Sequence, residues 1–177
     1  SIFINKKLML LANLNDLDAL YKLIDLLPED EDFDFWRGLR VKHYFLEGEF
    51  ETDNLACNIV NDVSLNNNDS FWKKAQIFCQ IIQGNEDDAL FEAELLKASG
   101  SQDENFFNLL NSMTQQNENF LIDETSLNLL DIAMMDQIRN IIPNEFIFKT
   151  PKYNYLALLN IENIQPETKA FMVDELL

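Results

Sequence analysis

The sequence predicts an all-α protein, built as a stack of antiparallel helix hairpins that repeat every 36 residues. Two features recur at that spacing: Phe35-Trp36 returns as Phe71-Trp72, and Gly48 returns as Gly84. Each Phe-Trp pair begins an apolar run with helical spacing, and each glycine follows the end of its run, where a positive φ is often needed. Only four glycines and four prolines occur in 177 residues, which disfavours an all-β sandwich. The repeat unit is therefore helix, tight turn, helix.

Carrying this spacing along the chain gives four expected helix pairs, near residues 3–27, 34–63, 69–99 and 103–135. The second helices share apolar residues at two repeated positions, which we expect to form one continuous apolar face. These residues are Ala19, Leu55, Phe91 and Leu127 at the first position and Ile24, Val60, Leu96 and Ile132 at the second. The last unit departs from the pattern, with Asn108 in place of tryptophan and Phe120 in place of glycine, as outer units of a stack often do.

Acidic residues stand directly before both Phe-Trp pairs. Asp34 and Asp69 are expected to cap the helices that follow, since carboxylates bind the exposed N–H groups and positive dipole of a helix start. A calcium loop beginning at Asp30 is the alternative. An EF-hand loop needs Gly at its sixth position and Glu at its twelfth, where this sequence has Phe35 and Val41. The acidic run from residue 28 to 34 is therefore predicted to be a solvated linker, and no metal site is expected.

The last forty residues lose the repeat spacing. Asp136–Ile142 is expected to form a short helix before a proline, and Glu145–Lys149 alternates in the manner of a brief extended segment. Tyr153–Asn160 and Pro166–Leu177 return to helical spacing, with the proline suited to a first helical turn.

We therefore divide the chain into a helical-repeat domain, residues 1–135, and an irregular helical extension or cap, residues 136–177. The chain begins with Ser1 rather than Met and ends inside the apolar run Asp174–Leu177. Both features lead us to expect part of a longer, truncated protein.

The repeat resembles tetratricopeptide-like and related α-solenoid proteins, whose usual repeat is close to 34 residues. Tyr44 lies four residues before Gly48, which matches that family's spacing between its aromatic residue and its small turn residue. Ala89 follows Gly84 by five residues, where the family places a small second-helix residue. The resemblance implies a right-handed, curved stack whose concave face is lined by first helices. Proteins of this class bind other proteins or peptides, or serve as scaffolds.

Composition restricts the partners. The chain has 31 Asp and Glu against 13 Lys and Arg, a formal net charge of −18. Sequence-independent binding to nucleic acid or anionic lipid needs clustered cations, so neither is expected. No run approaches the roughly 20 apolar residues that span a bilayer. The two cysteines, Cys57 and Cys79, are too few for a disulfide framework and are read as small buried hydrophobes. That reading favours a reducing, cytoplasmic compartment and leaves a periplasmic one open.

Catalysis is not expected. No phosphate-binding loop, dinucleotide fingerprint, nucleophile elbow or zinc spacing occurs, so no cofactor is expected either. His43 is the one histidine of the chain, which excludes a cluster of histidine ligands. A nucleophilic pair of His43 with Cys57 is conceivable on consecutive helices. We prefer a helix-face histidine beside core cysteines, because no third group to orient the pair is apparent.

Basic and amide side chains on two equivalent first helices suggest a binding groove. The predicted partner-binding residues are Arg37, Arg40, Lys73, Lys74, Gln76 and Gln80, with Lys42 and Gln83 nearby. Such a row is able to receive a peptide carboxylate or acidic side chains, with Trp36 and Trp72 as an apolar floor. The alternative is that these cations pair with neighbouring carboxylates and that the tryptophans are core.

The acidic surplus gives the opposite hypothesis. Carboxylates crowd the turns and second helices, at Asp16, Asp18, Asp25, Glu29 to Asp32, Glu47, Glu49, Glu51, Asp53, Glu86, Asp87 and Asp88. A basic partner surface is able to dock there, although such surfaces more commonly serve solubility. The expected function is a non-catalytic protein-interaction or scaffolding module. The alternative is a helical accessory domain of a larger enzyme whose catalytic part lies outside this chain.

Overall fold

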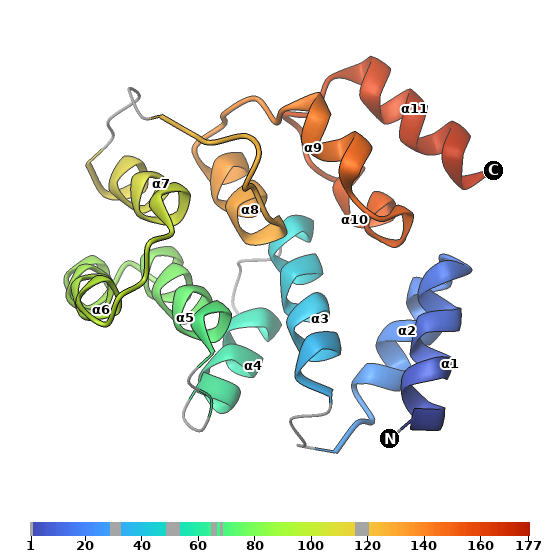
Figure 1. Cartoon of the computed structure of the whole chain (residues 1–177), viewed down its shortest axis with the longest axis horizontal. Coiled ribbons are helices and arrows are strands. Elements are labelled where there is room, and N and C mark those ends of the chain that lie inside the picture. Colours follow the sequence, from blue (N-terminus) through green and yellow to red (C-terminus); the bar gives the residue numbers. More distant parts are fainter. Residues whose placement is uncertain (1, 29–32, 49–53, 65–66, 68, 116–120) are drawn as a thin grey trace.

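The computed structural model describes residues 2–28, 33–48, 54–64, 67, 69–115 and 121–177, and within these ranges it contains helices, turns and loops but no strand (Figure 1). The helices are α1 (Ile2–Asn13), α2 (Leu17–Ile24), α3 (Asp34–Glu47), α4 (Leu55–Ser64), α5 (Ser70–Ile82), α6 (Glu86–Ala98), α7 (Glu104–Gln115), α8 (Leu129–Gln137), α9 (Asn144–Lys149), the 3₁₀ turn η2 (Lys152–Asn154), α10 (Tyr155–Leu158) and α11 (Pro166–Leu176). The predicted all-α class is confirmed over these residues.

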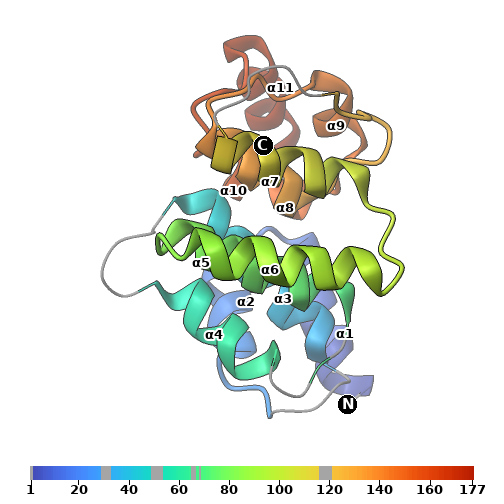
Figure 2. The same ribbon diagram turned by 90° about the vertical axis from the view of Figure 1, so that its left-hand side faces the viewer.

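Two helices lie in each of the four predicted ranges. α1 packs on α2, α3 on α4, α5 on α6 and α7 on α8. α4 also packs on α5, which joins the second pair to the third. Figure 1 shows α1 and α6 at opposite ends of the molecule, and in Figure 2, turned by 90°, α6 lies across the near face with α1 behind.

The two repeated glycines end helices as expected. Gly48 caps the C-terminus of α3 with φ 70°, and Gly84 follows the end of α5 with φ 78°. Open space surrounds both Cα atoms, so the need for glycine comes from this left-handed backbone conformation and not from crowding.

One of the two predicted N-caps is confirmed. Oδ1 of Asp69 accepts a hydrogen bond from the Phe71 backbone N–H at 2.7 Å, at the start of α5. Asp34 was predicted wrongly: it is the first residue inside α3, and its carboxylate accepts from Arg37 and Asn67. Those two donors take the carboxylate oxygens that a cap would have used. Most of the acidic run predicted to be a linker, residues 29–32, lies outside the described residues.

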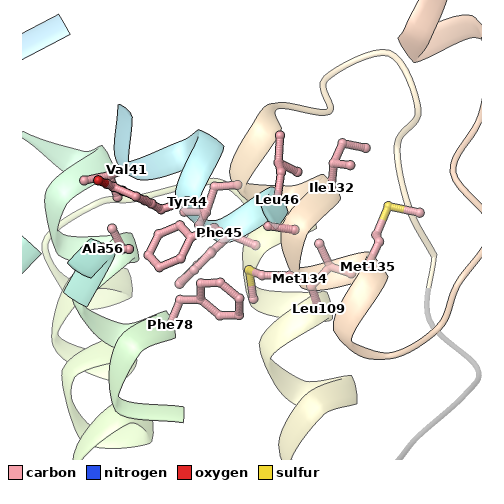
Figure 3. Packing of buried hydrophobic residues seen from close by; sticks show 14 of the residues in the cluster. Val41, Tyr44, Phe45, Leu46, Ala56, Phe78, Leu109, Ile132, Met134 and Met135 are labelled. Atoms are coloured by element: carbon pink, nitrogen blue, oxygen red, sulfur yellow. The ribbon is translucent and has the colours of Figure 1, made fainter. Parts of the chain in front are cut away.

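Buried side chains form two clusters. The larger joins α3, α4, α5, α7 and α8 to the C-terminal helices, and Figure 3 shows Phe45 of α3 meeting Phe78 of α5 beside Met134 of α8. The smaller lies among α1, α2 and α3. Trp72 belongs to the larger cluster with 2% of its surface exposed, and Trp36 to the smaller with 4% exposed. Both tryptophans are therefore core and cannot form the floor of a groove.

The C-terminal part of the chain folds back onto α3. Both α8 and α10 pack on this helix, whose partners in a simple stack would be its neighbours in sequence. A hydrogen bond of 2.9 Å between His43 and Asn154 joins residues 111 positions apart. One side of a predicted groove-lining helix is therefore covered by residues of the same chain.

The C-terminal extension is helical, with different boundaries from those expected. Glu145–Lys149 lies in α9 and is not extended; alternation over so few residues does not separate strand from helix. The helix expected over Asp136–Ile142 is also wrong. α8 ends at Gln137, and Arg139 adopts φ 54°, which is incompatible with a continuing helix. Pro166 begins α11 as predicted.

The continuous apolar face predicted for the second helices is only half buried. Ile24, Val60 and Ile132 are buried, whereas Leu55 and Phe91 at the other repeated position are exposed. The two positions are five residues apart, which places them about 140° apart around a helix. They therefore cannot face one core together.

The two cysteines are bonded to each other, which corrects their interpretation as separate buried hydrophobes. Cys57 of α4 and Cys79 of α5 form a disulfide with a Cα–Cα separation of 5.6 Å. Both residues are buried where α4 packs on α5. The sequence analysis considered Cys57 only together with His43. The two cysteines meet because α4, which carries Cys57, packs on α5, which carries Cys79.

Candidate functional site

Arg37 and Lys73, which lie 36 residues apart in the sequence, both bond within the chain. Nη1 of Arg37 lies 3.0 Å from Oδ1 of Asp34, and Nη2 donates to the Pro28 carbonyl. Nζ of Lys73 donates to the Ser64 carbonyl at 3.2 Å. These two cations therefore tie the start of α3 and the start of α5 to the segments just before them.

Arg40 is held between two aromatic rings. The centre of its guanidinium lies 3.6 Å from the ring centroid of Tyr21 and 3.6 Å from that of Tyr44. It also donates a hydrogen bond to the Tyr44 hydroxyl. Stacking of this kind is worth about 0.5–2 kcal/mol per ring, depending on how far water is excluded. Arg40 therefore joins α2 to α3.

The predicted amides lie on α5. Nε2 of Gln80 donates to a carboxylate oxygen of Glu92 at 3.0 Å, which links α5 to α6. Gln76 is half-buried on the same helix. Lys74, also on α5, forms an ion pair with Asp103 just before α7. The structure thus places the six predicted residues on α3 and α5, and five of them bond or stack against their own chain.

His43 lies at the centre of a buried polar cluster. Its Nδ1 is 2.5 Å from the Tyr21 hydroxyl, and its Nε2 is 2.9 Å from Oδ1 of Asn154. Because the amide oxygen only accepts, Nε2 carries the proton and Nδ1 accepts from Tyr21. Burial, and next the positive charge of Arg40, lower the pKa of His43 to about 4, although the bond to Asn154 acts in the other direction. The imidazole is therefore neutral and none of its surface is exposed.

This arrangement has a structural role. The cluster joins α2, α3 and η2, with both ring nitrogens occupied and no exposed edge through which a bound molecule is able to exchange a proton. Cys57 offers no thiol because it is bonded to Cys79. The Cys57–His43 nucleophilic pair is therefore absent from the structure.

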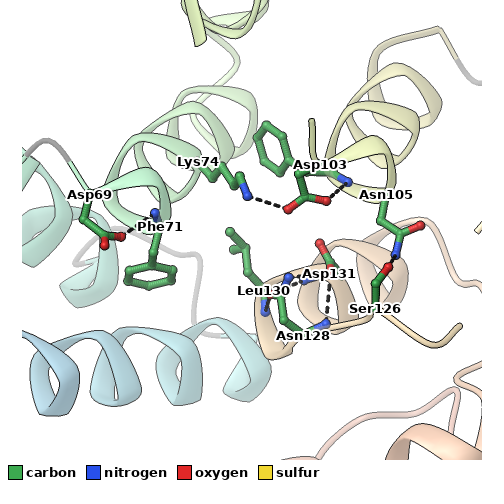
Figure 4. A network of polar contacts seen from close by, with 10 residues as sticks. Asp69, Phe71, Lys74, Asp103, Asn105, Ser126, Asn128, Leu130 and Asp131 are labelled. Carbon is green, nitrogen blue, oxygen red and sulfur yellow. Dashed lines mark hydrogen bonds and ion pairs between the residues drawn. The ribbon is translucent and has the colours of Figure 1, made fainter. Parts of the chain in front are cut away.

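A second polar cluster lies between α5, the segment just before α7 and the start of α8 (Figure 4). Oδ2 of Asp131 accepts from the backbone N–H of Asn128 at 2.9 Å, which completes a capping box at the start of α8. Oδ1 of Asp131 is buried and has no hydrogen-bond partner among the described residues. Burial, and also the charge of Asp103, raise the pKa of Asp131 to about 7, while Lys74 and Lys42 oppose the shift. Lys74, one of the predicted partner-binding residues, thus pairs with a carboxylate of the chain's own C-terminal half.

The Tyr21–His43 contact and the Cys57–Cys79 disulfide occupy matching places. The members of each pair are 22 residues apart, and each member of the second pair lies 36 residues after its counterpart in the first. The first pair joins α2 to α3 and the second joins α4 to α5. The same helix-to-helix contact is therefore made by a hydrogen bond in one place and by a covalent bond in the next.

Two helices at opposite ends of the molecule leave apolar side chains exposed. We define the α6 face as Asp88, Phe91, Glu94 and Leu95, all of them exposed. We define the α1 face as Phe3, Lys6, Lys7, Leu10 and Leu14, also all exposed. At 100° per residue, the members of each face lie within about 60° of a common direction on their helix or its first following turn.

The part of the chain that the structure describes shows neither a candidate metal site nor a candidate membrane span. Within the ranges that the structure describes, no three His, Cys, Asp or Glu side chains lie close enough together to hold a metal ion. None of the helices in those ranges combines the length and the hydropathy required to cross a bilayer.

Comparison of the chain with protein-family models, with curated proteins and with solved structures finds no match. Assignment of a function therefore rests on the geometry of this molecule.

The protonation of His43 predicts a loss of stability in acid. The folded-state pKa is about 4 and the ordinary value is 6.5. As pH falls from 6.5 to 4, the unfolded chain gains a proton that the folded chain does not bind, so stability is lost across that window and is fully present above it. The difference in pKa corresponds to about 3 kcal/mol.

His43→Gln is the variant that checks this expectation. We expect the free energy of unfolding of the parent to fall relative to that of the variant as pH drops from 6.5 to 4, measured by urea denaturation at each pH. Asp131 is present in both proteins, so its contribution to the pH dependence of stability cancels when their free energies of unfolding are compared. A difference that stays constant with pH, or an imidazole NMR signal that titrates near 6.5, would show that the folded chain binds the proton.

Proposed function

We propose that this protein is a non-catalytic helical module that binds another protein through exposed apolar side chains on its outer helices. The observation that carries the proposal is the α6 face, where Phe91 is 66% and Leu95 54% exposed between carboxylates. Adjacent large apolar residues that remain exposed commonly mark an interaction site in soluble proteins. A polar rim around apolar residues is typical of such sites.

We propose further that α1 to α8 form a tetratricopeptide-like stack with a repeat of about 36 residues. The matching places of the Tyr21–His43 and Cys57–Cys79 contacts support this arrangement, because a duplicated hairpin repeats its helix-to-helix contacts at the period of the sequence. Further support comes from Phe35-Trp36 and Phe71-Trp72, which each occupy the second and third positions of a first helix.

The row of cations predicted from the sequence is a rival location for the same function. It includes Arg37 and Lys73, and it lies on helices that pack against the rest of the chain. Binding there would have to replace internal hydrogen bonds, whereas binding at the α6 face covers side chains that solvent already surrounds. We therefore place the partner on the α6 face.

A comparison of two double variants as affinity baits tests the proposal. We expect Phe91→Ser with Leu95→Ser to lose the proteins that the parent captures from extracts of its source cells. Arg37→Gln with Lys73→Gln is the matched control and should retain them. Equal helicity of the three proteins by circular dichroism excludes unfolding as the cause.

Loss of capture in the Arg37 and Lys73 variant alone would move the binding surface to the first-helix row. A parent protein that captures nothing above the tag alone, with or without cross-linking, would contradict the proposed function itself.

A further inference from the structure

We propose that copies of this chain associate head to tail, with the α1 face of one copy on the α6 face of the next. The inference rests on the proposed function and names the partner as a second copy. Three observations lead to it: the apolar character of both faces, their opposite charges, and their positions at opposite ends of the molecule.

The α6 face carries negative charge. Phe91 and Leu95 follow each other by one turn along α6, with the exposed carboxylates Asp88 and Glu94 on either side. The first turn of the same helix adds Glu86 and further acidic side chains. On its inner side α6 packs on α5 through the buried residues Ala89 and Ala93.

The α1 face carries positive charge. Phe3 is 79% and Leu10 58% exposed, with Leu14 one turn further along. Lys6 and Lys7 lie between Phe3 and Leu10 and are also exposed. The helix contains no acidic residue, although the chain as a whole has a formal charge of −18. α1 is therefore a basic, apolar surface on an acidic protein.

Charge selects the pairing of these faces. Two α6 faces brought together would place carboxylates against carboxylates, and two α1 faces would place lysines against lysines. One α1 face against one α6 face brings apolar side chains together while opposite charges meet at the edges, which favours the encounter and fixes the partner. The basic partner surface that the sequence analysis considered for the acidic residues would thus be the α1 face of a second copy of the chain.

The positions of the faces determine the kind of assembly. α1 and α6 lie at opposite ends of the long axis in Figure 1, and along that axis in Figure 2 α6 lies in front and α1 behind. A contact between two different surfaces leaves one of each unoccupied at the ends of the complex, so copies continue to add unless a ring closes. Each copy would contribute a single helix face, whereas a standard interface buries roughly 800 Å² per partner, so association is expected to be weak.

Charge-reversal variants mixed with each other provide the test. Lys6→Glu with Lys7→Glu makes both faces acidic, and Asp88→Lys with Glu94→Lys makes both faces basic. Sedimentation velocity of the full chain in low-salt buffer should show the parent growing beyond a dimer as concentration rises. Each variant alone should associate more than about tenfold more weakly. An equimolar mixture should regain the association of the parent, because every α1 face then meets an α6 face of opposite charge.

Lys149→Glu with Lys169→Glu changes the net charge by the same amount as Lys6→Glu with Lys7→Glu but at other helices, and should associate like the parent. High salt should weaken association of the parent and of the mixture together. A parent that stays monomeric at every concentration, a species that stops at a dimer, or a mixture that fails to recover would each overturn the head-to-tail assembly. If the parent is monomeric but its bait captures other proteins through Phe91 and Leu95, this inference fails and the proposed function stands.

Discussion

Trp72→Ala is expected to lower the free energy of unfolding by about 3–5 kcal/mol. The indole is 2% exposed in the larger cluster and packs edge to face on Phe71 at 5.0 Å between ring centroids. Removing it takes away buried apolar surface and leaves a space that rigid neighbouring helices cannot fill. Denaturation in urea, followed by circular dichroism at neutral pH, measures the change.

Phe91→Ala is the matched control for this substitution, because it also removes an aromatic ring from a helix but from an exposed position. We expect it to change the free energy of unfolding by less than about 0.5 kcal/mol. A Trp72→Ala protein as stable as its parent would show that the indole is not core, and the packing of α5 described above would be wrong.

Loss of the Cys57–Cys79 disulfide is expected to cost about 3.5 kcal/mol. The bond closes a loop between residues 22 positions apart, and a crosslink of that length restricts the unfolded chain by about this amount. The native contact is undemanding, because the two helices already pack together at this point. Urea denaturation of the parent with and without a reductant measures the effect.

The variant Cys57→Ala with Cys79→Ala separates the crosslink from general effects of the reductant. Its free energy of unfolding should be lower than that of the oxidised parent and should not respond to reductant. Alkylation of the unfolded parent without reductant should add no label. Two labelled cysteines in that experiment would show that the bond does not form.

Local features of the fold could be predicted from the sequence. Phe35-Trp36 and Phe71-Trp72 located the starts of α3 and α5 because large apolar residues shortly after an acidic residue are typical of a first helical turn, although only Asp69 of the two acids is an N-cap. Gly48 and Gly84 located the ends because few other residues accept a positive φ there. Each of these helix boundaries depends on residues within a few positions of it, so it can be predicted without knowledge of the tertiary structure.

Long-range contacts could not be predicted in the same way. The bond between His43 and Asn154 depends on α10 folding back onto α3, and no local pattern announces a contact across 111 positions. The predicted roles of the basic side chains were the most affected by the missing long-range contacts. Lys74 was predicted to be a groove residue, with pairing to a neighbouring carboxylate as the alternative; its ion-pair partner Asp103 lies beyond α6 in the chain, so no local pattern identifies it.

The sequence relates the disulfide to the Tyr21–His43 contact through the 36-residue spacing, although it does not identify either contact by itself. Cys79 lies 36 residues after His43, and the residue 36 positions before Cys57 is Tyr21. Applying the repeat to both members of a pair predicts that Tyr21 and His43 touch if Cys57 and Cys79 do. The exposure of Phe91 and Leu95 also had a signal: they are four residues apart, as are the buried Ala89 and Ala93, but the two pairs are offset by two residues and so lie on opposite sides of the helix.

Two helix-to-helix contacts are sensitive to different chemical conditions. The contact between α2 and α3 includes a neutral imidazole, so acid is expected to weaken it. The contact between α4 and α5 includes a disulfide bond, so a reducing agent is expected to weaken it. Acid and reductant are therefore expected to weaken two different helix-to-helix contacts of the same molecule.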